Sequence, residues 1–195
     1  MKIIIFDFDG VIHDTFELAY KINVDIFGEN FTRDQYRDFF NGNIFEKTKT
    51  KDNDKFFEAQ NEAFKYLKID DGIRKNLEKL YESNSLFIIS SNQKVALDIY
   101  FNNNNFINIF KEVLGSEMHQ SKVEKFKYLF EKYNSSAEDC IFITDTLGDI
   151  LEGNKVGVKT IAVDFGFHER HRLEKGNPFK IVSSFDEILE VINSI

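Results

Sequence analysis

The chain has 195 residues, 42% of them hydrophobic and 22 of them Phe, which is enough to bury the core of one domain with a small insert. Its net charge of −8 argues against a general nucleic-acid or anionic-membrane surface, although a small anionic substrate responds to local charge. A single Cys excludes an internal disulfide and a Cys-based zinc site. No apolar run approaches the roughly 18 residues of a membrane helix. We therefore expect a cytoplasmic protein, either a monomer or a homodimer.

The first apolar stretch, Ile3 to Phe6, is short, β-branched and aromatic, which is typical of a strand buried on both faces of a parallel sheet. Asp7 and Asp9 follow at its carboxyl end, where open α/β sheets bind their ligands. Residues two apart in an extended segment point the same way, so both carboxylates can address one point. Gly10 allows a sharp turn close to a ligand. Two like charges this close usually need a cation or a proton between them, whereas the alternative interpretation is a surface turn with solvated acids.

Residues 15–71 have a helical pattern and contain no strand-like run. Apolar side chains recur three and four residues apart. Phe16, Tyr20 and Val24 are spaced by four, and Phe39 and Phe40 follow Tyr36 by three and four. A polar, Lys-rich stretch from Lys47 to Lys55 divides this region. We interpret that stretch as a solvated loop, and the alternative is a basic loop over a phosphate site. The pattern predicts an insert of four helices between the first strand and the rest of the sheet.

From residue 72 onward, strand-like and helical stretches alternate, which implies right-handed crossovers and a doubly wound parallel sheet. Ser121 followed by Glu124 is a capping-box signature and predicts a helix that begins beside Lys122. A basic cluster at residues 168–172, which includes His168, is interpreted as a solvated loop, with a role beside the substrate as the alternative. The later strands are predicted at Leu86–Ile89, Val113–Leu114, Cys140–Ile143, Thr160–Val163 and Ile181–Val182.

Polar side chains recur where the predicted strands end. Ser90 follows the second strand, Asp145 and Asp149 follow the fourth, and Lys122 lies in the first turn of a helix. Because the carboxyl ends of parallel strands meet at one edge of a sheet, these side chains can converge on the acids after the first strand. Oxygen-only anionic ligands at an open site suit Mg²⁺. A carboxylate can attack phosphorus, and cations and hydrogen-bond donors would then stabilise the charge on the phosphoryl oxygens.

Each of these residues also has a structural interpretation. Asp145 and Asp149 could cap a helix and favour its dipole, and Ser90 could simply begin a helix. Lys122 alone could be a surface lysine, and Lys125 and Lys127 are its nearest alternatives.

In their order along the chain, these residues resemble the four motifs of the haloacid dehalogenase-like (HAD) hydrolase superfamily. Asp7-Phe8-Asp9-Gly10-Val11 resembles the first motif, and Asp145-Thr146 with Asp149 resembles the fourth. Ser90 and Lys122 stand in the places of the second and third motifs, which are persuasive only in order and spacing. The insert resembles the small helical cap of the phosphoglycolate phosphatase and β-phosphoglucomutase branch. The resemblance implies a Rossmann-like α/β core at residues 1–14 and 72–195 and a helical cap domain at residues 15–71.

The resemblance also implies a Mg²⁺-dependent hydrolase of a small phosphorylated metabolite. Asp7 would be the nucleophile that forms an aspartyl-phosphate, and Asp9 would protonate the leaving alcohol and then activate water. The Mg²⁺ ion would be held by the Asp7 carboxylate, the Asp9 backbone carbonyl and Asp145, with Asp149 orienting that shell. The phosphate would be bound by Phe8, Gly10, Ser90, Ser91 and Lys122.

Two features depart from the usual pattern of this branch: Thr144 precedes Asp145 where many relatives have Gly, and the insert is somewhat short. The short insert leaves the substrate open. Dehalogenation is disfavoured, because enzymes that cleave carbon–halogen bonds lack an acid at the position of Asp9. The nearest alternative is a phosphomutase of the β-phosphoglucomutase kind, which uses the same core residues. A non-catalytic phospho-acceptor resembling a receiver domain fits less well, because receivers have no helical insert after the first strand.

Overall fold

The computed structural model of the chain describes residues 2–47 and 53–195. Its strands form one sheet in the order β3-β2-β1-β4-β5-β6, and every neighbouring pair is parallel. The chain adds strands outward from β1 to β3 and then crosses back to β4, which places a topological switch point between β1 and β4. The predicted doubly wound parallel sheet is thereby confirmed. The strands are β1 (Ile3–Phe6), β2 (Ser85–Ile89), β3 (Phe110–Leu114), β4 (Cys140–Thr144), β5 (Lys159–Val163) and β6 (Lys180–Val182).

Strand β1 lies at the centre of the sheet and packs on both faces, as its unbroken apolar sequence predicts. Ile4 and Phe6 belong to the larger hydrophobic cluster, and Ile5 belongs to a second cluster on the opposite face. The larger cluster lies under α5 (Asp71–Tyr81), α6 (Lys94–Asn103) and α10 (Phe185–Ser194). The opposite face is covered by α7 (Lys122–Tyr133) and α8 (Leu147–Val156).

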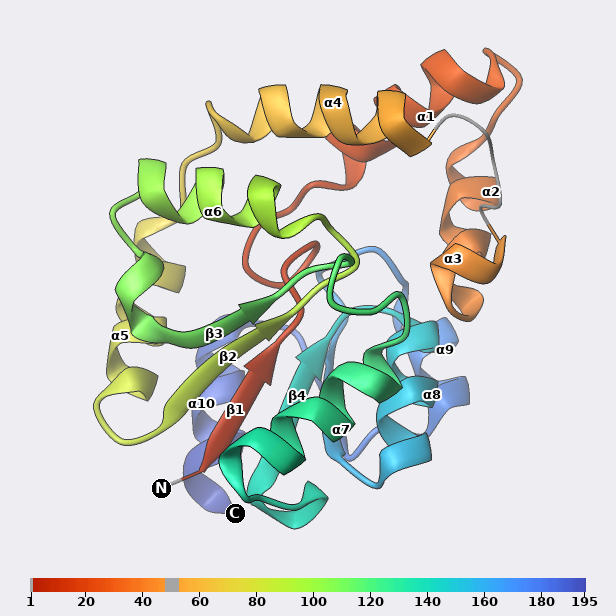
Figure 1. The fold of residues 1–195 in the computed structure, drawn as a ribbon. Helices are drawn as coiled ribbons and strands as arrows, with labels where there is room; N and C mark the ends of the chain where they lie inside the picture. The colour runs from red at the N-terminus through yellow and green to blue at the C-terminus, as the bar shows by residue number, and fades with distance from the viewer. Residues whose placement is uncertain (1, 48–52) are drawn as a thin grey trace.

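Between β1 and α5 the chain forms a helical insert. Within the described residues this insert contains four α-helices and one 3₁₀ turn, in agreement with the predicted four helices. Figure 1 shows the insert, which runs from orange-red to yellow, above the loops to which the strand arrows point. Residues 48–52, the centre of the predicted Lys-rich loop, lie outside the described residues. The insert consists of α1 (Phe16–Phe27), α2 (Arg33–Asp38), η1 (Phe39–Asn41), α3 (Ile44–Lys47) and α4 (Asn53–Phe64).

The loop after β5 joins the insert to the core. The ring of Phe167 packs among aromatic side chains of α1 and η1, with centroids 5.1 Å from those of Phe16 and Phe40. His168 accepts a hydrogen bond from the backbone N–H of Leu147 at Nδ1, and its Nε2 lies 2.9 Å from the carbonyl oxygen of Arg37 in α2. The prediction of a solvated loop is therefore wrong for His168, which is fully buried. The reason is that both ring nitrogens find backbone partners inside the protein.

No helix among residues 2–47 and 53–195 is long and apolar enough to cross a bilayer.

Candidate active site

The turn after β1 brings the first motif to the sheet edge. The backbone N–H of Asp7 donates to the carbonyl of Ile143, so the chain stays beside β4 for one more residue. The N–H of Phe8 donates to Asp7 Oδ1 at 2.7 Å and fixes the orientation of that carboxylate. Gly10 has a φ of +68°, and a Cβ there would collide with the carboxyl group of Asp145. Gly10 therefore makes room for the second acid. Its own N–H donates to a backbone carbonyl 2.8 Å away, that of His13, and is not directed to a phosphate.

Lys122 lies between two carboxylates. Its Nζ is 2.8 Å from Asp7 Oδ2 and 2.5 Å from Asp149 Oδ2, and the side chain is almost completely buried. Ser121 begins α7 by accepting a hydrogen bond from the N–H of Val123, which places Lys122 in the first turn, as the sequence predicts. The reciprocal half of the predicted capping box is not formed, because the Glu124 carboxylate pairs with Lys127 in the same helix. Of the two candidate lysines, Lys122 lies beside the acids at the strand ends, whereas Lys127 is exposed.

The charges of Lys122, Asp7 and Asp149 shift one another's pKa values. Burial alone would lower the pKa of Lys122, but Asp149 and Asp7 raise it above its usual value, so the ammonium stays charged. Burial raises the pKa of Asp7, and the charge of Lys122 opposes this effect. Burial would also raise the pKa of Asp149, yet Lys122 and hydrogen bonds from Asp7, Lys122 and Thr144 hold it below its usual value. The Thr144 hydroxyl donates to Asp149 Oδ2 at 2.8 Å.

Asp145 has one carboxylate oxygen that nothing satisfies. Its Oδ2 accepts a hydrogen bond from the N–H of Phe167 at 2.7 Å, whereas Oδ1 is buried with no partner. Burial raises the pKa of Asp145, and the charges of Asp149 and Asp9 raise it further. A Cβ at Gly166 would press against Asp145 and would lie 2.7 Å from the backbone oxygen of Gly10. This buried, unpaired oxygen in a tight cradle is a suitable ligand for a hard cation.

The donor set fits Mg²⁺ with few protein ligands. Residues 2–47 and 53–195 contain no group of three or more acidic, His or Cys side chains spaced to hold a metal by themselves. If the carboxylates of Asp7 and Asp145 and the backbone carbonyl of Asp9 held the ion, as the resemblance implies, the remaining positions would be left to water and phosphate. That division is the one Mg²⁺ usually accepts.

Asp9 is held by hydrogen bonds at both carboxylate oxygens. Thr15 Oγ1 donates to Oδ1 at 2.5 Å, and Asn92 Nδ2 donates to Oδ2 at 2.7 Å. Asn92 in turn accepts from Gln60 Nε2, in α4 of the insert, at 2.9 Å. Burial raises the pKa of Asp9 to about 6, against the opposing effects of Thr15, Lys122 and Asn92. A carboxyl group with this pKa can give and take a proton near neutral pH, as a general acid and base must.

The two serines after β2 differ in position. Ser90 is fully buried, and its hydroxyl accepts a hydrogen bond from the N–H of Asn92 at 3.0 Å. Its carbonyl accepts from Lys125 Nζ at 2.5 Å, and burial together with the nearby charge of Lys122 lowers the pKa of Lys125 to about 7. Ser91 instead lines both cavities at the site, and Ser90 lines neither. The Ser90 hydroxyl is thus engaged by the backbone of Asn92, and its contact with a phosphate stays a prediction.

Several polar side chains that support the site have no motif of their own. Thr15 and Asn92 hold Asp9, and Gln60 reaches the same carboxylate through Asn92. Asn92 directly follows the two serines at the end of β2, and this is the one sequence signal that could have identified it. Gln60 lies in a helix with an ordinary amphipathic pattern, so only the tertiary structure could place it.

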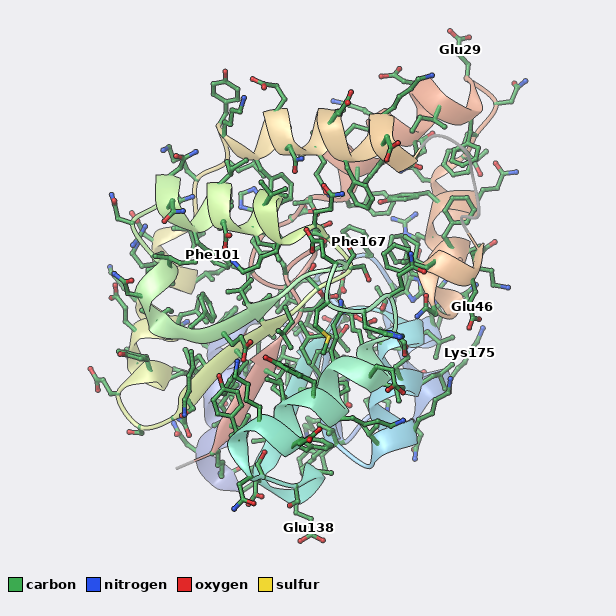
Figure 2. All side chains as sticks on the ribbon, in the orientation of Figure 1. Glu29, Glu46, Phe101, Glu138, Phe167 and Lys175 are labelled. Atoms are coloured by element: carbon green, nitrogen blue, oxygen red, sulfur yellow. The ribbon has the colours of Figure 1, made fainter. Side chains whose placement is uncertain are left out.

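Two adjoining cavities lie beneath the insert. The polar one has a volume of about 30 Å³ and is lined by Asp7, Asp9, Asp145 and Asp149 among others. The other has a volume of about 80 Å³ and is lined mainly by side chains of the insert, many of them aromatic. Asp9, Ser91 and Phe167 line both, and Figure 2 shows Phe167 between the insert and the strand ends. A polar, acid-lined chamber and an apolar one therefore share a wall.

Comparison with known proteins agrees with this geometry. A 5′-nucleotidase of Pseudomonas aeruginosa is 27% identical over 128 residues, which is 64% of this chain and 58% of that protein's length. A haloacid dehalogenase-like family hydrolase from Streptococcus pneumoniae superposes with a TM-score of 0.81 at 20% identity, covering 98% of each chain. A predicted phosphoglycolate phosphatase from Haemophilus somnus superposes with a TM-score of 0.79 at 16% identity, again covering 98% of each. These two structures share the fold.

The model of the family described as haloacid dehalogenase-like hydrolase matches residues 4–163 of this chain. That range contains every residue that the sequence analysis assigned to the four motifs, and it runs from β1 to the end of β5. The resemblance read from the sequence is confirmed, and so is the prediction of an enzyme. The chain belongs to the haloacid dehalogenase-like hydrolase family.

Proposed function

We propose that the chain is a phosphomonoester hydrolase that requires Mg²⁺ and forms an aspartyl-phosphate on Asp7. The observation that carries this proposal is the position of Asp7 at the switch point of the sheet, paired with buried Lys122 and sharing a cavity with Asp145, whose Oδ1 is unpaired. The names of two similar proteins, a 5′-nucleotidase and a predicted phosphoglycolate phosphatase, support the reaction class.

The metal would be held by the carboxylates of Asp7 and Asp145 and the backbone carbonyl of Asp9. Mg²⁺ bound there neutralises charge on the phosphoryl oxygens. Asp149, which is bound to Lys122 and Thr144, supports this arrangement as a partner of the lysine. A cation bound there would give the buried Oδ1 of Asp145 a partner, and it would oppose the rise in the pKa of Asp145 that burial and the neighbouring acids cause.

In the first step, a carboxylate oxygen of Asp7 attacks phosphorus while the bond from phosphorus to the alcohol oxygen breaks. Asp9 gives its proton to that oxygen. In the second step, Asp9 takes a proton from a water molecule, the water oxygen attacks phosphorus, and the bond to Asp7 breaks. Lys122 stays within 2.8 Å of Asp7 and offsets the negative charge beside the nucleophile.

We assign the phosphate-binding hydroxyl to Ser91 and a supporting role to Ser90. Ser91 lines the chamber that holds the acids, whereas Ser90 fixes the backbone of Asn92 and the ammonium of Lys125. The N–H of Phe8 is engaged by Asp7 Oδ1, so its proposed donation to the phosphate requires that bond to give way when the substrate binds. Gly10 is retained as the residue that shapes the turn.

Residues 15–71 are proposed to act as a cap domain. The insert covers the strand ends in Figure 1 and meets the core through Asn43, whose side-chain amide donates to Glu152 Oε1 at 3.2 Å. A closed cap excludes bulk water, which strengthens electrostatic interactions in the chamber.

The test is phosphate release from a panel of small phosphomonoesters, with Mg²⁺ and with a chelator. Asp7→Asn should abolish turnover while its circular dichroism and melting temperature stay close to those of the native protein. Asp71→Asn, an exposed aspartate in the first turn of α5, is the matched control and should retain turnover. Retained activity in Asp7→Asn would remove the nucleophile assignment, and activity unaffected by the chelator would remove the metal.

A further inference from the structure

The apolar cavity next to the acids lies where the alcohol part of a substrate must sit. Asp9, the proposed acid for the leaving oxygen, lines this cavity as well as the polar chamber. A phosphate near Asp7 therefore directs the rest of its ester past Asp9 into the space beneath α4. The chemistry of that space selects the alcohol.

Half of the residues that line this cavity are Phe or Tyr, and almost all of these come from the insert. The rings of Tyr36 and Phe40 pack edge to face, with centroids 5.2 Å apart, and Phe56 and Phe57 form a second such pair at 5.7 Å. Aromatic walls of this kind bind flat, apolar ring systems by stacking and edge-to-face contact.

Within the described part of the chain, Asp9 is the single charged residue among those that line the cavity. The guanidinium of nearby Arg37 is bound elsewhere, to the carbonyl of Phe167 and to Glu169. A second anionic group on the substrate, such as the carboxylate of phosphoglycolate or a second phosphate, would enter an apolar space without a cationic partner. Burial of such an unpaired charge is strongly unfavourable.

Gln60 provides a specific polar contact in this cavity. Its Nε2 donates a hydrogen bond to Asn92, which in turn donates to Asp9. The other polar atom of the Gln60 amide, the acceptor Oε1, takes no part in this chain of bonds. Oε1 is buried and has no hydrogen-bond partner, and the residue is 2% exposed. A buried acceptor without a donor calls for a ligand that supplies one, such as an N–H group.

We propose that the alcohol part of the substrate carries an uncharged, planar ring system with an N–H donor, as in a nucleoside monophosphate; this proposal rests on the proposed function. The ring occupies the aromatic cavity, and its N–H donates to Gln60 Oε1. Gln60 is then a specificity-determining residue. It also connects the bound ring to the orientation of Asp9 through Asn92.

The experiment compares kcat/KM at pH 7 with Mg²⁺ for four esters. Uridine 5′-monophosphate carries a ring with N–H, phenyl phosphate a ring without it, glycerol phosphate an uncharged chain, and phosphoglycolate a second anion. We expect the nucleotide to exceed phosphoglycolate by at least about 100-fold, because the unpaired anion loses its solvation. Gln60→Leu should lower kcat/KM for the nucleotide about 5- to 10-fold more than for phenyl phosphate, as expected for one lost hydrogen bond.

Two further variants separate recognition from general damage. Phe57→Leu should lower kcat/KM for both ring esters relative to glycerol phosphate. Glu58→Gln, exposed on the same helix, should leave all four values unchanged. Faster hydrolysis of phosphoglycolate or glycerol phosphate than of the nucleotide would overturn the inference while leaving the hydrolase assignment intact, and so would equal losses for the nucleotide and phenyl phosphate in Gln60→Leu. Absence of Asp7-dependent release from every ester would instead overturn the proposed function and this inference with it.

Discussion

Replacement of Lys122 by Met tests the central ion cluster directly. The change keeps the length of the side chain but removes the ammonium that lies 2.8 Å from Asp7 and 2.5 Å from Asp149. Both carboxylates remain buried, and nothing else of positive charge bonds to them in the described part of the chain. Breaking a buried ion pair by removal of one partner typically costs about 3–5 kcal/mol.

The cost of protonating a buried carboxylate gives a similar loss in the free energy of unfolding for Lys122→Met. The variant can relieve the repulsion if one carboxyl of the pair takes up a proton. At pH 7, protonation of a group whose ordinary pKa is about 3.9 costs about 4 kcal/mol, and at pH 5 it costs about 1.5 kcal/mol. The carboxyl concerned is Asp149, because Lys122 holds its pKa below the usual value in the native protein, whereas burial already raises the pKa of Asp7. In the variant the folded-state pKa of Asp149 is raised above its unfolded value. Folding of the variant therefore takes up a proton. As the pH rises from 5 to 7, the free energy of unfolding of the variant falls, relative to that of the native protein, by about 1.4 kcal/mol for each pH unit.

The assay is urea denaturation with a chelator present, since a bound cation could replace the ammonium. Far-UV circular dichroism is the signal, because the chain has no Trp. With a slope of about 2 kcal/mol per molar urea, the midpoint should fall by about 2 M at pH 7. Lys127→Met is the control: Lys127 lies in the same helix, is 60% exposed and pairs with Glu124, so its loss should change stability by less than about 0.5 kcal/mol.

The reasoning about Lys122 is refuted by either of two results. One is a loss below about 1 kcal/mol in Lys122→Met at pH 7, far below the cost of an unpaired buried carboxylate. The other is a loss of equal size at pH 5 and pH 7, which would mean that no proton replaces the ammonium and that the cost comes from packing.

Two more predictions concern the contact between insert and core. In Gly148→Ala the new methyl group would press on the insert backbone, 2.7 Å from the carbonyl carbon of Gly42 and 2.9 Å from the carbonyl oxygen of Phe40. KM should therefore rise several-fold for every ester with little change in melting temperature, and an unchanged KM would show that this contact does not govern closure. Burial lowers the pKa of His168 in the folded protein. Between the unfolded-state pKa of about 6.5 and this lower folded-state pKa, the unfolded chain binds more protons than the folded one. The free energy of unfolding therefore falls as the pH falls through this range. His168→Asn should flatten this slope, measured by urea denaturation at pH 5 and 7, whereas His171→Asn, an exposed control, should leave it unchanged; equal slopes in both variants would contradict the prediction.

Much of the site follows from local sequence. Ile3–Phe6 forms the central strand because an unbroken apolar run that stops at two acids can be buried on both faces only in the middle of a parallel sheet. Asp7, Lys122 and Asp149 then meet because successive parallel strands end at one edge. Ser121 was sufficient to place Lys122 in a first turn, since a helix cap depends on residues only a few positions apart.

The sequence could not determine which of two neighbouring side chains faces the site. Ser90 and Ser91 have the same chemistry, and consecutive residues in an extended segment point to opposite sides, so the twist of the turn after β2 decides between them. His168 was predicted to be solvated because its neighbours are basic. Its buried ring instead pairs with the carbonyl of Arg37 in the insert and with the N–H of Leu147 in the core. Such partners lie far away along the chain, and no local pattern records them.

By itself, then, the sequence determined the parallel sheet and the acids and lysine at its edge, because these depend on periodicity and on the ends of strands. The family followed from the resemblance of those edge residues to known motifs. Only the tertiary structure decided the shape and charge of the space beside Asp9. That space is formed by α1, α2, η1, α3 and α4 together with Phe167, more than 100 residues away along the chain. The pairing of Gln60 with Asn92 likewise depends on how α4 lies over the end of β2. Apolar periodicity specifies that a helix is buried, but packing specifies what it is buried against.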